Sequence, residues 1–433
     1  MLIQFVVENF RSFRDETVFS MRAATNVERA PGAPDLAAGS TTLRCAALYG
    51  ANASGKSNFV KALRFARDLV VRGVPERGRI PTQPFRLDSA SAEAPSRCEI
   101  YLRADSGQTY GYGFAARADA IVDEWLSWVD GDDEREVFSR SGNDFTFSPE
   151  IEASVQDFLR LVSSATRDNQ LFLRTTREFK RERFPPAFQD VMVWFEFLLV
   201  IIEPDAKFVG LIRRADEEPA FRAFLDEVLV RADTGISSVR TERTEVEVGE
   251  SVNPSELASS FGPGRAEFLS KDGATFRLDL RLRHGDSPDA GFGLEDESDG
   301  TVRLLELAPM LFLAPKTPRV FVVDEMDRSM HTTLTRWLVE RFVTEAPGSA
   351  SQLVFTTHDT NLLDLEVLRP DAIWFAEKDA SGASSLFSLA EFKREQIEQL
   401  GGELEQGYLN GRFGAIPFLG GSTRLAGPQE GQK

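Results

Sequence analysis

Short alternating runs of apolar and polar residues dominate the first third of the chain and predict β-strands. Residues 2–7 form one expected strand and residues 17–20 a second, with residues 8–13 between them. A further strand, expected at residues 45–49, leads directly into a glycine-rich string. Alternation over residues 98–147 predicts an antiparallel meander.

The period of the apolar positions changes after residue 147. Ser148 and Pro149 suit a helix N-cap and first turn, and Val155, Phe158 and Val162 recur at helical spacing. We therefore expect a mostly helical insertion, an arm or lid, over residues 148–235. Strands resume at about 236–283, and helix and strand then alternate to about residue 405. The sequence therefore predicts a head made of two halves, residues 1–147 and 236–420, with the arm at 148–235 inserted between them. Residues 421–433 are predicted to be a disordered tail.

Composition narrows the class of protein. The 433 residues are 42% hydrophobic and 27% charged, which is ordinary for a soluble globular protein of two or three domains. The sequence contains no run of about 18 apolar residues, so it predicts no membrane span. The first residues lack the features of a secretory signal, and we therefore expect a cytoplasmic protein. Cys45 and Cys98 lack metal-ligand spacing. A formal charge of −18 repels polyanions, so nucleic-acid contact would need a local basic patch.

Residues 50–57 match the phosphate-binding loop GxxxxGK[ST]. Glycines let backbone N–H groups close around phosphates, Lys56 supplies positive charge, and the Ser57 hydroxyl is a ligand for Mg²⁺. A chance match in a Gly/Ser turn is the alternative, but the strand before and the helix after favour nucleotide binding. The expected nucleotide-binding residues of this string are Gly50, Asn52, Ala53, Ser54, Gly55, Lys56, Ser57 and Asn58.

A matching acidic string occurs at residues 320–325, where four apolar residues precede Asp324 and Glu325. Asp324 is expected to hold Mg²⁺ at the end of a buried strand, and Glu325 to act as general base on the attacking water. Taken alone, the string would be an acidic turn at a strand end. The 268 positions between Lys56 and Asp324 (324 − 56) indicate inserted domain material between the two halves of one nucleotide site, as in ATP-binding-cassette heads.

Three further strings favour a cassette. The string at 297–301, ESDGT, places Ser298 and Gly300 before a helical apolar pattern, where they could meet a phosphate of a partner subunit; a plain capped helix is the alternative. The string at 354–359 ends a strand in His358, which suits a γ-phosphate sensor, although a lone histidine is usually structural. Asp327, Ser329 and His331 would face a dimer seam or form a solvated turn.

Together, the strings NFRSF, GANASGKS, ESDGT, VVDEMDRSMH, TTHD and GYLNGRFGAIP resemble the OLD-like, ABC-type AAA family ATPases. These are relatives of the chromosome-maintenance and RecF heads and include abortive-infection and other anti-phage ATPases. The resemblance spans almost the whole chain. It implies an α/β fold, an ABC-type P-loop ATPase head with an antiparallel β subdomain and an inserted helical arm.

The resemblance also implies site residues and partners. Two heads would pair head to tail, with Lys56, Ser57, Asp324, Glu325 and His358 acting in cis and Ser298 and Gly300 completing the site in trans. Arg11 and Ser12 fall where the family's N-terminal hairpin approaches the nucleotide, and Gln83 falls near the glutamine that senses Mg²⁺ and water. The string ESDGT has Asp where transporter cassettes have a second Gly. No carboxylate-rich Toprim nuclease module follows the ATPase motifs, as it would in a full OLD protein, which argues against intrinsic nuclease activity. The resemblance implies a separate effector that carries the toxic activity.

One basic run stands out in the expected arm. If the segment is helical, Arg174, Arg177 and Arg181 share one face, but Glu178 and Glu182 dilute their charge, so a solvated face is the default over nucleic-acid contact. The glycines of the closing string at 407–417 would allow tight turns, and the string suggests no chemical role.

These patterns predict an ATP- and Mg²⁺-dependent molecular switch that forms a homodimer or higher homo-oligomer and controls a separate effector, for which a nuclease is one candidate, in anti-phage defence. The alternatives are a RecF-like DNA-repair clamp, which the net charge disfavours, and a nucleotide-binding scaffold without turnover, which Glu325 disfavours.

Overall fold

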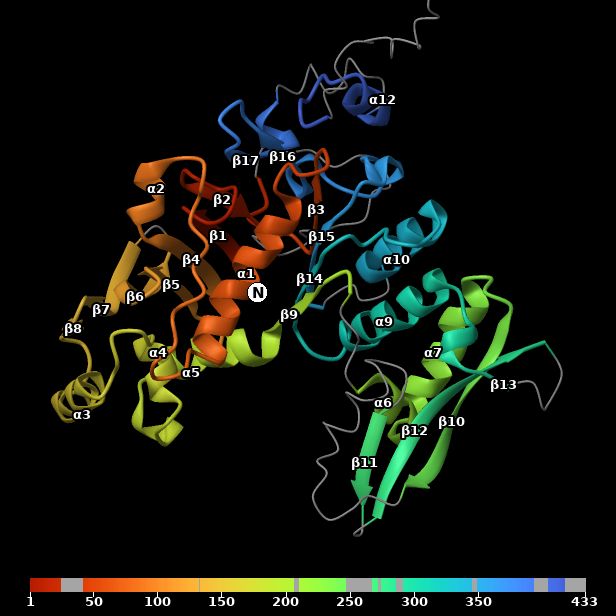
Figure 1. The fold of residues 1–433 in the computed structure, drawn as a ribbon, viewed down its shortest axis with the longest axis horizontal. Helices are drawn as coiled ribbons and strands as arrows, with labels where there is room; N and C mark the ends of the chain where they lie inside the picture. Colours follow the sequence, from red (N-terminus) through yellow and green to blue (C-terminus); the bar gives the residue numbers. More distant parts are fainter. Residues whose placement is uncertain are drawn as a thin grey trace, which may run out of the picture.

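The protein is described by a computed structural model that covers residues 1–24, 42–131, 133–205, 210–246, 267–271, 274–285, 291–344, 349–392 and 404–416. The tail predicted at 421–433 lies outside these residues. In the described ranges, no helix has the length and apolar character that crossing a membrane requires. The described chain forms three sheets with helices around them (Figure 1).

The central sheet is mostly parallel and has the order β17-β16-β3-β15-β14-β9. Its strands read as nearly continuous apolar runs because helices cover both faces. In Figure 1 they stand between α1 on one side and α9 and α10 on the other. The strands are β3 (Cys45–Tyr49), β9 (Leu199–Ile202), β14 (Val320–Val323), β15 (Gln352–Thr356), β16 (Ile373–Lys378) and the antiparallel edge strand β17 (Ser384–Ser388), and the helices are α1 (Lys56–Val71), α9 (Asp299–Leu313) and α10 (Thr332–Thr344).

The second sheet is antiparallel and has the order β2-β1-β4-β5-β6-β7-β8. It confirms the meander predicted over residues 98–147, since each strand from β4 to β8 pairs with the next. Its strands are β1 (Leu2–Glu8), β2 (Thr17–Ser20), β4 (Ser96–Arg103), β5 (Thr109–Ala116), β6 (Ile121–Asp130), β7 (Asp133–Ser141) and β8 (Asp144–Phe147), and the short helix α2 (Ser89–Glu93) precedes β4.

Helix α1 packs against both sheets. Phe59 contacts Phe5 and Phe19 of the antiparallel sheet, with ring centroids 5.8 and 4.8 Å apart, and Phe65 lies 5.9 Å from Phe114. The buried residues cover most of the helix, and Lys61, Arg64 and Asp68 form a polar face that stays partly accessible. The first turn of α1 is therefore held in place from two sides.

The range 148–235 is largely helical but does not form one separate arm. Its helical elements are α3 (Ala153–Ser164), α4 (Phe172–Thr176), η1 (Arg181–Arg183), α5 (Pro186–Val193), η2 (Trp194–Leu198), α6 (Leu211–Glu217) and α7 (Pro219–Arg231). Phe172 and Phe188 pack on Phe138 of the antiparallel sheet. Strand β9, which was not expected, pairs in parallel with β14 and completes the central sheet. The β9 residues form a short apolar run without period-2 alternation, which periodicity alone does not distinguish from part of a helix.

The third sheet is formed by residues of the second half of the chain and lies beside α6 and α7 (Figure 1). Its strands are β10 (Ile236–Val246), β11 (Glu267–Lys271), β12 (Ala274–His284) and β13 (Gly291–Phe292). Phe221 of α7 packs on Phe312 of α9, with ring centroids 4.9 Å apart, which joins this part to the central sheet's helices. The remaining short elements are η3 (Leu294–Asp296), η4 (Thr360–Leu362), η5 (Pro370–Ala372), η6 (Leu389–Glu391) and α12 (Leu404–Leu409).

A buried carboxylate fixes α4 to the antiparallel sheet. Glu124 is 0% exposed and accepts hydrogen bonds from the Phe172 and Leu173 backbone N–H groups (2.6 and 3.0 Å) and from the Tyr112 hydroxyl (2.9 Å). The Arg140 guanidinium lies 3.8 Å away and is also buried. These groups satisfy one another, so removing one leaves several buried polar groups unpaired.

We expect Glu124→Ala to lower the free energy of unfolding by about 3–5 kcal/mol, because Arg140 and three donors lose their acceptor. Urea denaturation measures the change. Glu136→Ala, at an exposed position of the neighbouring strand β7, should stay within about 0.5 kcal/mol of wild type. Equal unfolding midpoints for the two variants would contradict the assigned role of Glu124.

Candidate nucleotide site

The glycine-rich loop lies between the carboxyl end of β3 and the first residue of α1, as the sequence predicts. Gly50 and Gly55 adopt positive φ angles of 151° and 123°. A Cβ at Gly50 would lie 2.4 Å from the Ala376 carbonyl oxygen, and one at Gly55 would lie 2.6 Å from Ser384 Oγ. Strands β16 and β17 therefore approach the loop so closely that glycine is required at both positions.

Lys56 lies within the loop and is 5% exposed. Its Nζ donates to the carbonyl oxygens of Gly50 at 2.7 Å and Ala51 at 3.1 Å. Burial lowers the pKa of Lys56 to about 8, although Asp324, Asp327 and Glu325 act to raise it. A buried ammonium with a depressed pKa gains from an anionic ligand, which is the chemistry of a phosphate site.

The structure brings the acidic string to the loop. Asp324 is 3% exposed, and its Oδ1 accepts hydrogen bonds from the hydroxyls of Ser57 at 3.2 Å and Thr356 at 2.6 Å. The Thr356 oxygen also accepts from the Glu325 backbone N–H at 2.8 Å. Glu325 adopts φ 49°, a conformation that non-glycine residues hold only when their surroundings fix it. Thr356 therefore positions both carboxylate residues. No sequence motif indicates this role of Thr356.

His358 follows β15 at the same edge of the sheet. Its backbone N–H donates to the Asp327 carboxylate, with the nearer oxygen at 3.3 Å. His358 is an exposed residue, but partial burial of its imidazole lowers its pKa, and the positive charge of Lys56 lowers it further. The lowered pKa favours a neutral imidazole at pH 7.

Ser298 and Gly300 lie at the start of α9. The Ser298 hydroxyl caps the helix by accepting from the Thr301 N–H at 3.1 Å, and a Cβ at Gly300 would lie 2.6 Å from the Ser329 carbonyl oxygen. The turn therefore packs on the segment that contains Asp327 and Ser329. Within the described ranges, no hydrogen bond or ion pair joins Ser298 or Gly300 to the phosphate loop of the same chain.

Arg303 connects helix α9 to Asp324 and Glu325, and no sequence motif identifies this residue. Arg303 is buried, and its guanidinium donates to the carbonyl oxygens of Asp324 at 3.1 Å, Glu325 at 3.3 Å and Glu203 at 3.4 Å. Glu203 directly follows β9, whose last residue, Ile202, accepts from the Asp324 N–H at 2.9 Å. The position of Glu203 at this edge of the sheet depends on β9, a strand that the sequence pattern does not predict.

The N-terminal hairpin lies beside the loop. The Ser12 hydroxyl accepts from Asn58 Nδ2 at 2.8 Å, and the Ser12 carbonyl accepts from the Ser384 N–H at 2.7 Å. The Arg11 N–H donates to the Gln83 carbonyl at 2.6 Å. Arg11 and Gln83 line a cavity of about 420 Å³ together with Glu203, Lys61 and Arg64. Arg11 and Gln83 thus lie together next to α1.

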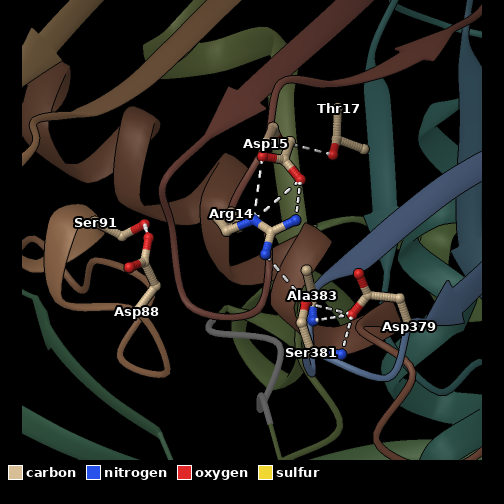
Figure 2. Close-up of polar contacts among 8 residues, drawn as sticks. All are labelled: Arg14, Asp15, Thr17, Asp88, Ser91, Asp379, Ser381 and Ala383. Carbon is tan, nitrogen blue, oxygen red and sulfur yellow. Dashed lines mark hydrogen bonds and ion pairs between the residues drawn. The ribbon is translucent and has the colours of Figure 1, made fainter.

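Figure 2 shows how the hairpin is held against the turn between β16 and β17. The Arg14 guanidinium binds the Asp15 carboxylate and donates to the Ser381 hydroxyl at 3.1 Å. The Asp379 carboxylate accepts from the N–H groups of Ser381 and Ala383, both at 2.8 Å, and so closes that turn. Ser384, the next residue, donates its hydroxyl to the Ser54 carbonyl at 2.6 Å.

These residues fit a nucleotide with Mg²⁺. The loop offers a buried ammonium, and the Ser54 hydroxyl is buried without a hydrogen-bond partner. No group of three or more His, Cys, Asp or Glu side chains suited to a metal occurs in the described part of the chain. Ser57 and Asp324 supply one hydroxyl and one carboxylate, which matches Mg²⁺ sites that rely on substrate phosphates for further ligands.

The basic run of the expected arm does not form one free helical face. Helix α4 ends at Thr176, so Arg174, Arg177 and Arg181 do not share a helix. Arg177 binds Glu196 at 2.6 Å and the Val71 carbonyl at 2.7 Å, and Arg181 lies 3.3 Å from Glu196. These contacts neutralise much of the charge that was considered for nucleic-acid binding.

The fold and site define a P-loop protein of the α/β class. The chain belongs to the family described as "AAA domain, putative AbiEii toxin, Type IV TA system", which matches residues 45–364. This family is of the ATPase type, and the motifs from the phosphate loop to His358 lie inside the matched range. A comparison with curated proteins found no match.

Solved structures that resemble the chain include heads of SMC proteins. The SMC head domain from Thermotoga maritima has a TM-score of 0.37 and 14% identity, covering 89% of this chain and 98% of that one. An Smc head with an extended coiled coil, bound to the C-terminal domain of ScpA, from Pyrococcus furiosus has a TM-score of 0.41 and 14% identity, covering 93% and 99%. An Smc head with a coiled coil and joint from Pyrococcus yayanosii has a TM-score of 0.42 and 11% identity, covering 94% and 99%.

The depressed pKa of Lys56 predicts how nucleotide affinity depends on pH. The ligand-free ammonium loses its proton above about pH 8, whereas bound phosphates would raise its pKa. ADP affinity should therefore be constant below pH 8 and fall by up to about tenfold per pH unit above it. Calorimetric titrations between pH 7 and 9.5 measure this. Lys180→Ala, at an exposed position outside the site, should show the same profile, and a flat wild-type profile would contradict the assignment.

Proposed function

We propose that the protein is an ATP-hydrolysing molecular switch that dimerises head to tail and controls a separate effector in prokaryotic anti-phage defence. The observation that carries the ATPase part is the meeting of Lys56, Ser57 and Asp324 at one edge of the central sheet, with Glu325 beside them. Lys56 and Asp324 are 268 positions apart in sequence (324 − 56), and a turn with a purely structural role would not require them to meet. Membership of an ATPase-type family supports the same conclusion.

Each residue has a role that its surroundings support. Lys56 would bind the β- and γ-phosphates, and Ser57 and Asp324 would hold Mg²⁺, which neutralises developing charge on the phosphates. Glu325 would accept the proton of the attacking water, held in place by Thr356. His358, neutral at pH 7, would donate a hydrogen bond to the γ-phosphate. Arg11, Ser12 and Gln83 are proposed to border the nucleotide.

A second head would complete the site. Ser298 and Gly300 present a helix N-terminus, which favours phosphate, and they make no described contact with their own loop. We therefore place them against the nucleotide of the partner head. Binding of ATP would close the two heads and hydrolysis would open them.

The biological setting rests on family likeness. The family's description names a toxin and a type IV toxin–antitoxin system, and the motifs resemble OLD-like ATPases of anti-phage systems. The effector would be a separate protein, for which a nuclease is one candidate, acting in the cytoplasm. The RecF-like alternative requires a broad basic surface, whereas the chain carries −18 and its basic run binds internal partners. Stimulation of ATP hydrolysis by DNA, with steep salt dependence, would favour that alternative.

Glu325→Gln should lower ATP hydrolysis by about 10²- to 10⁴-fold while nucleotide stays bound, because the base is lost but the loop and Asp324 remain. Light scattering should then show dimers in ATP. The exposed Glu366→Gln is the matched control and should behave as wild type. Undiminished hydrolysis would exclude Glu325 as base, and monomers of both wild type and Glu325→Gln in ATP would contradict the dimer.

Mixing two variants tests whether Ser298 acts across the interface. Ser298→Arg and Lys56→Ala should each be inactive alone, since both sites of each homodimer are damaged. A heterodimer would carry both lesions in one site and none in the other, so mixing should restore up to about half the activity per intact heterodimer if the sites act independently. Robust hydrolysis by Ser298→Arg alone would remove this turn from the nucleotide site.

A further inference from the structure

We call residues 404–416 the C-terminal strap; they include most of the closing glycine-rich string. The strap packs beside the start of the phosphate loop. Tyr408 is 7% exposed, and its ring stacks on Phe375 of β16 and meets Tyr49, the residue before Gly50, with centroids 5.6 and 6.1 Å apart. Phe413 also stacks on Phe375, at 5.8 Å. The strap is therefore part of the core beside the start of the loop.

The Tyr408 hydroxyl fixes the strap at the point where the Tyr408 ring meets Tyr49. It donates to the Ala415 carbonyl at 3.1 Å, which closes the strap on itself. Burial raises the pKa of the Tyr408 phenol, and the neighbouring Gly50 backbone acts against that rise. A side chain from the other end of the chain thus lies against Tyr49, the residue that precedes the first glycine of the loop.

A second part of the strap reaches the loop that carries His358. Glu405 accepts a hydrogen bond from the Thr360 hydroxyl, two residues after His358. The Ala415 N–H donates to the Glu377 carboxylate at 3.4 Å, and a Cβ at Gly414, where φ is 69°, would lie 3.1 Å from the same carboxylate. The glycines permit the tight turns that bring all these contacts into one segment.

We propose that the strap is a positioning element that holds the phosphate loop, through Tyr408, and the His358 loop, through Glu405, in one arrangement. This rests on the proposed nucleotide site. A preordered loop loses less freedom when it closes on phosphates, so loosening the strap beside Tyr49 should weaken nucleotide binding. Releasing Thr360 should instead disturb His358 and slow turnover.

Tyr408→Phe keeps the ring and removes the hydroxyl. Its KM for ATP should rise about two- to tenfold, the usual effect of one hydrogen bond, with kcat changed less than about twofold. The matched control is Tyr101→Phe, which removes a hydroxyl that donates to Glu99 at 2.8 Å in the antiparallel sheet. Its KM should equal that of wild type. Identical KM values for the two variants would overturn the role of Tyr408.

Glu405→Ala should lower kcat with little change in KM, and Glu405→Gln, which keeps an acceptor for Thr360, should restore it. A purely structural role would instead lower the melting temperature of Glu405→Ala while kcat per folded molecule stayed at the wild-type value. Equal kcat values for Glu405→Ala and wild type would overturn the link to the His358 loop.

Hydrogen exchange without nucleotide separates this inference from the proposed function. Peptides covering residues 50–57 should exchange faster in Tyr408→Phe than in Tyr101→Phe, at unchanged melting temperature. Equal exchange would overturn the strap even if wild type hydrolyses ATP. Faster exchange would uphold it even if wild type shows no ATPase activity, an outcome that would contradict the proposed function alone.

Discussion

The enclosure of α1 between two sheets is the constraint on which the candidate site depends. Phe59 and Phe65 reach the antiparallel sheet, while β3 and the neighbouring parallel strands lie along the other side of the helix. Because α1 begins at Lys56, fixing the helix fixes the end of the phosphate loop. Burial of the loop in turn lowers the pKa of Lys56 and so prepares the site for an anion.

Two polar residues fix the positions of Asp324 and Glu325. Thr356 bonds both Asp324 and the Glu325 backbone, so β15 determines where the two carboxylates stand. Arg303 binds the carbonyl oxygens of the same pair from α9. Helix α9 also packs on α7 through Phe312, beside the third sheet.

The division of the chain differs from the one that periodicity suggested. Residues up to Ile202 return to the central sheet through β9, and α4 is bound to the antiparallel sheet by Glu124. The stretch from α6 to β13 is the part that stands beside the central sheet's helices (Figure 1). The long separation between Lys56 and Asp324 therefore contains both head and added material, and the domain boundaries within it stay predictions.

The sequence by itself determined the phosphate loop, the acidic strand end, the meander and the α/β class, because each depends on local residue types and short-range periodicity. Glycines at 50 and 55 and the apolar run before Asp324 are such local signals. Only the tertiary structure decided that β9 is a strand, that Thr356 and Arg303 hold the acidic pair, and that Tyr408 packs on Tyr49, the residue before Gly50. These depend on contacts between residues far apart in the chain, whose partners no local pattern specifies.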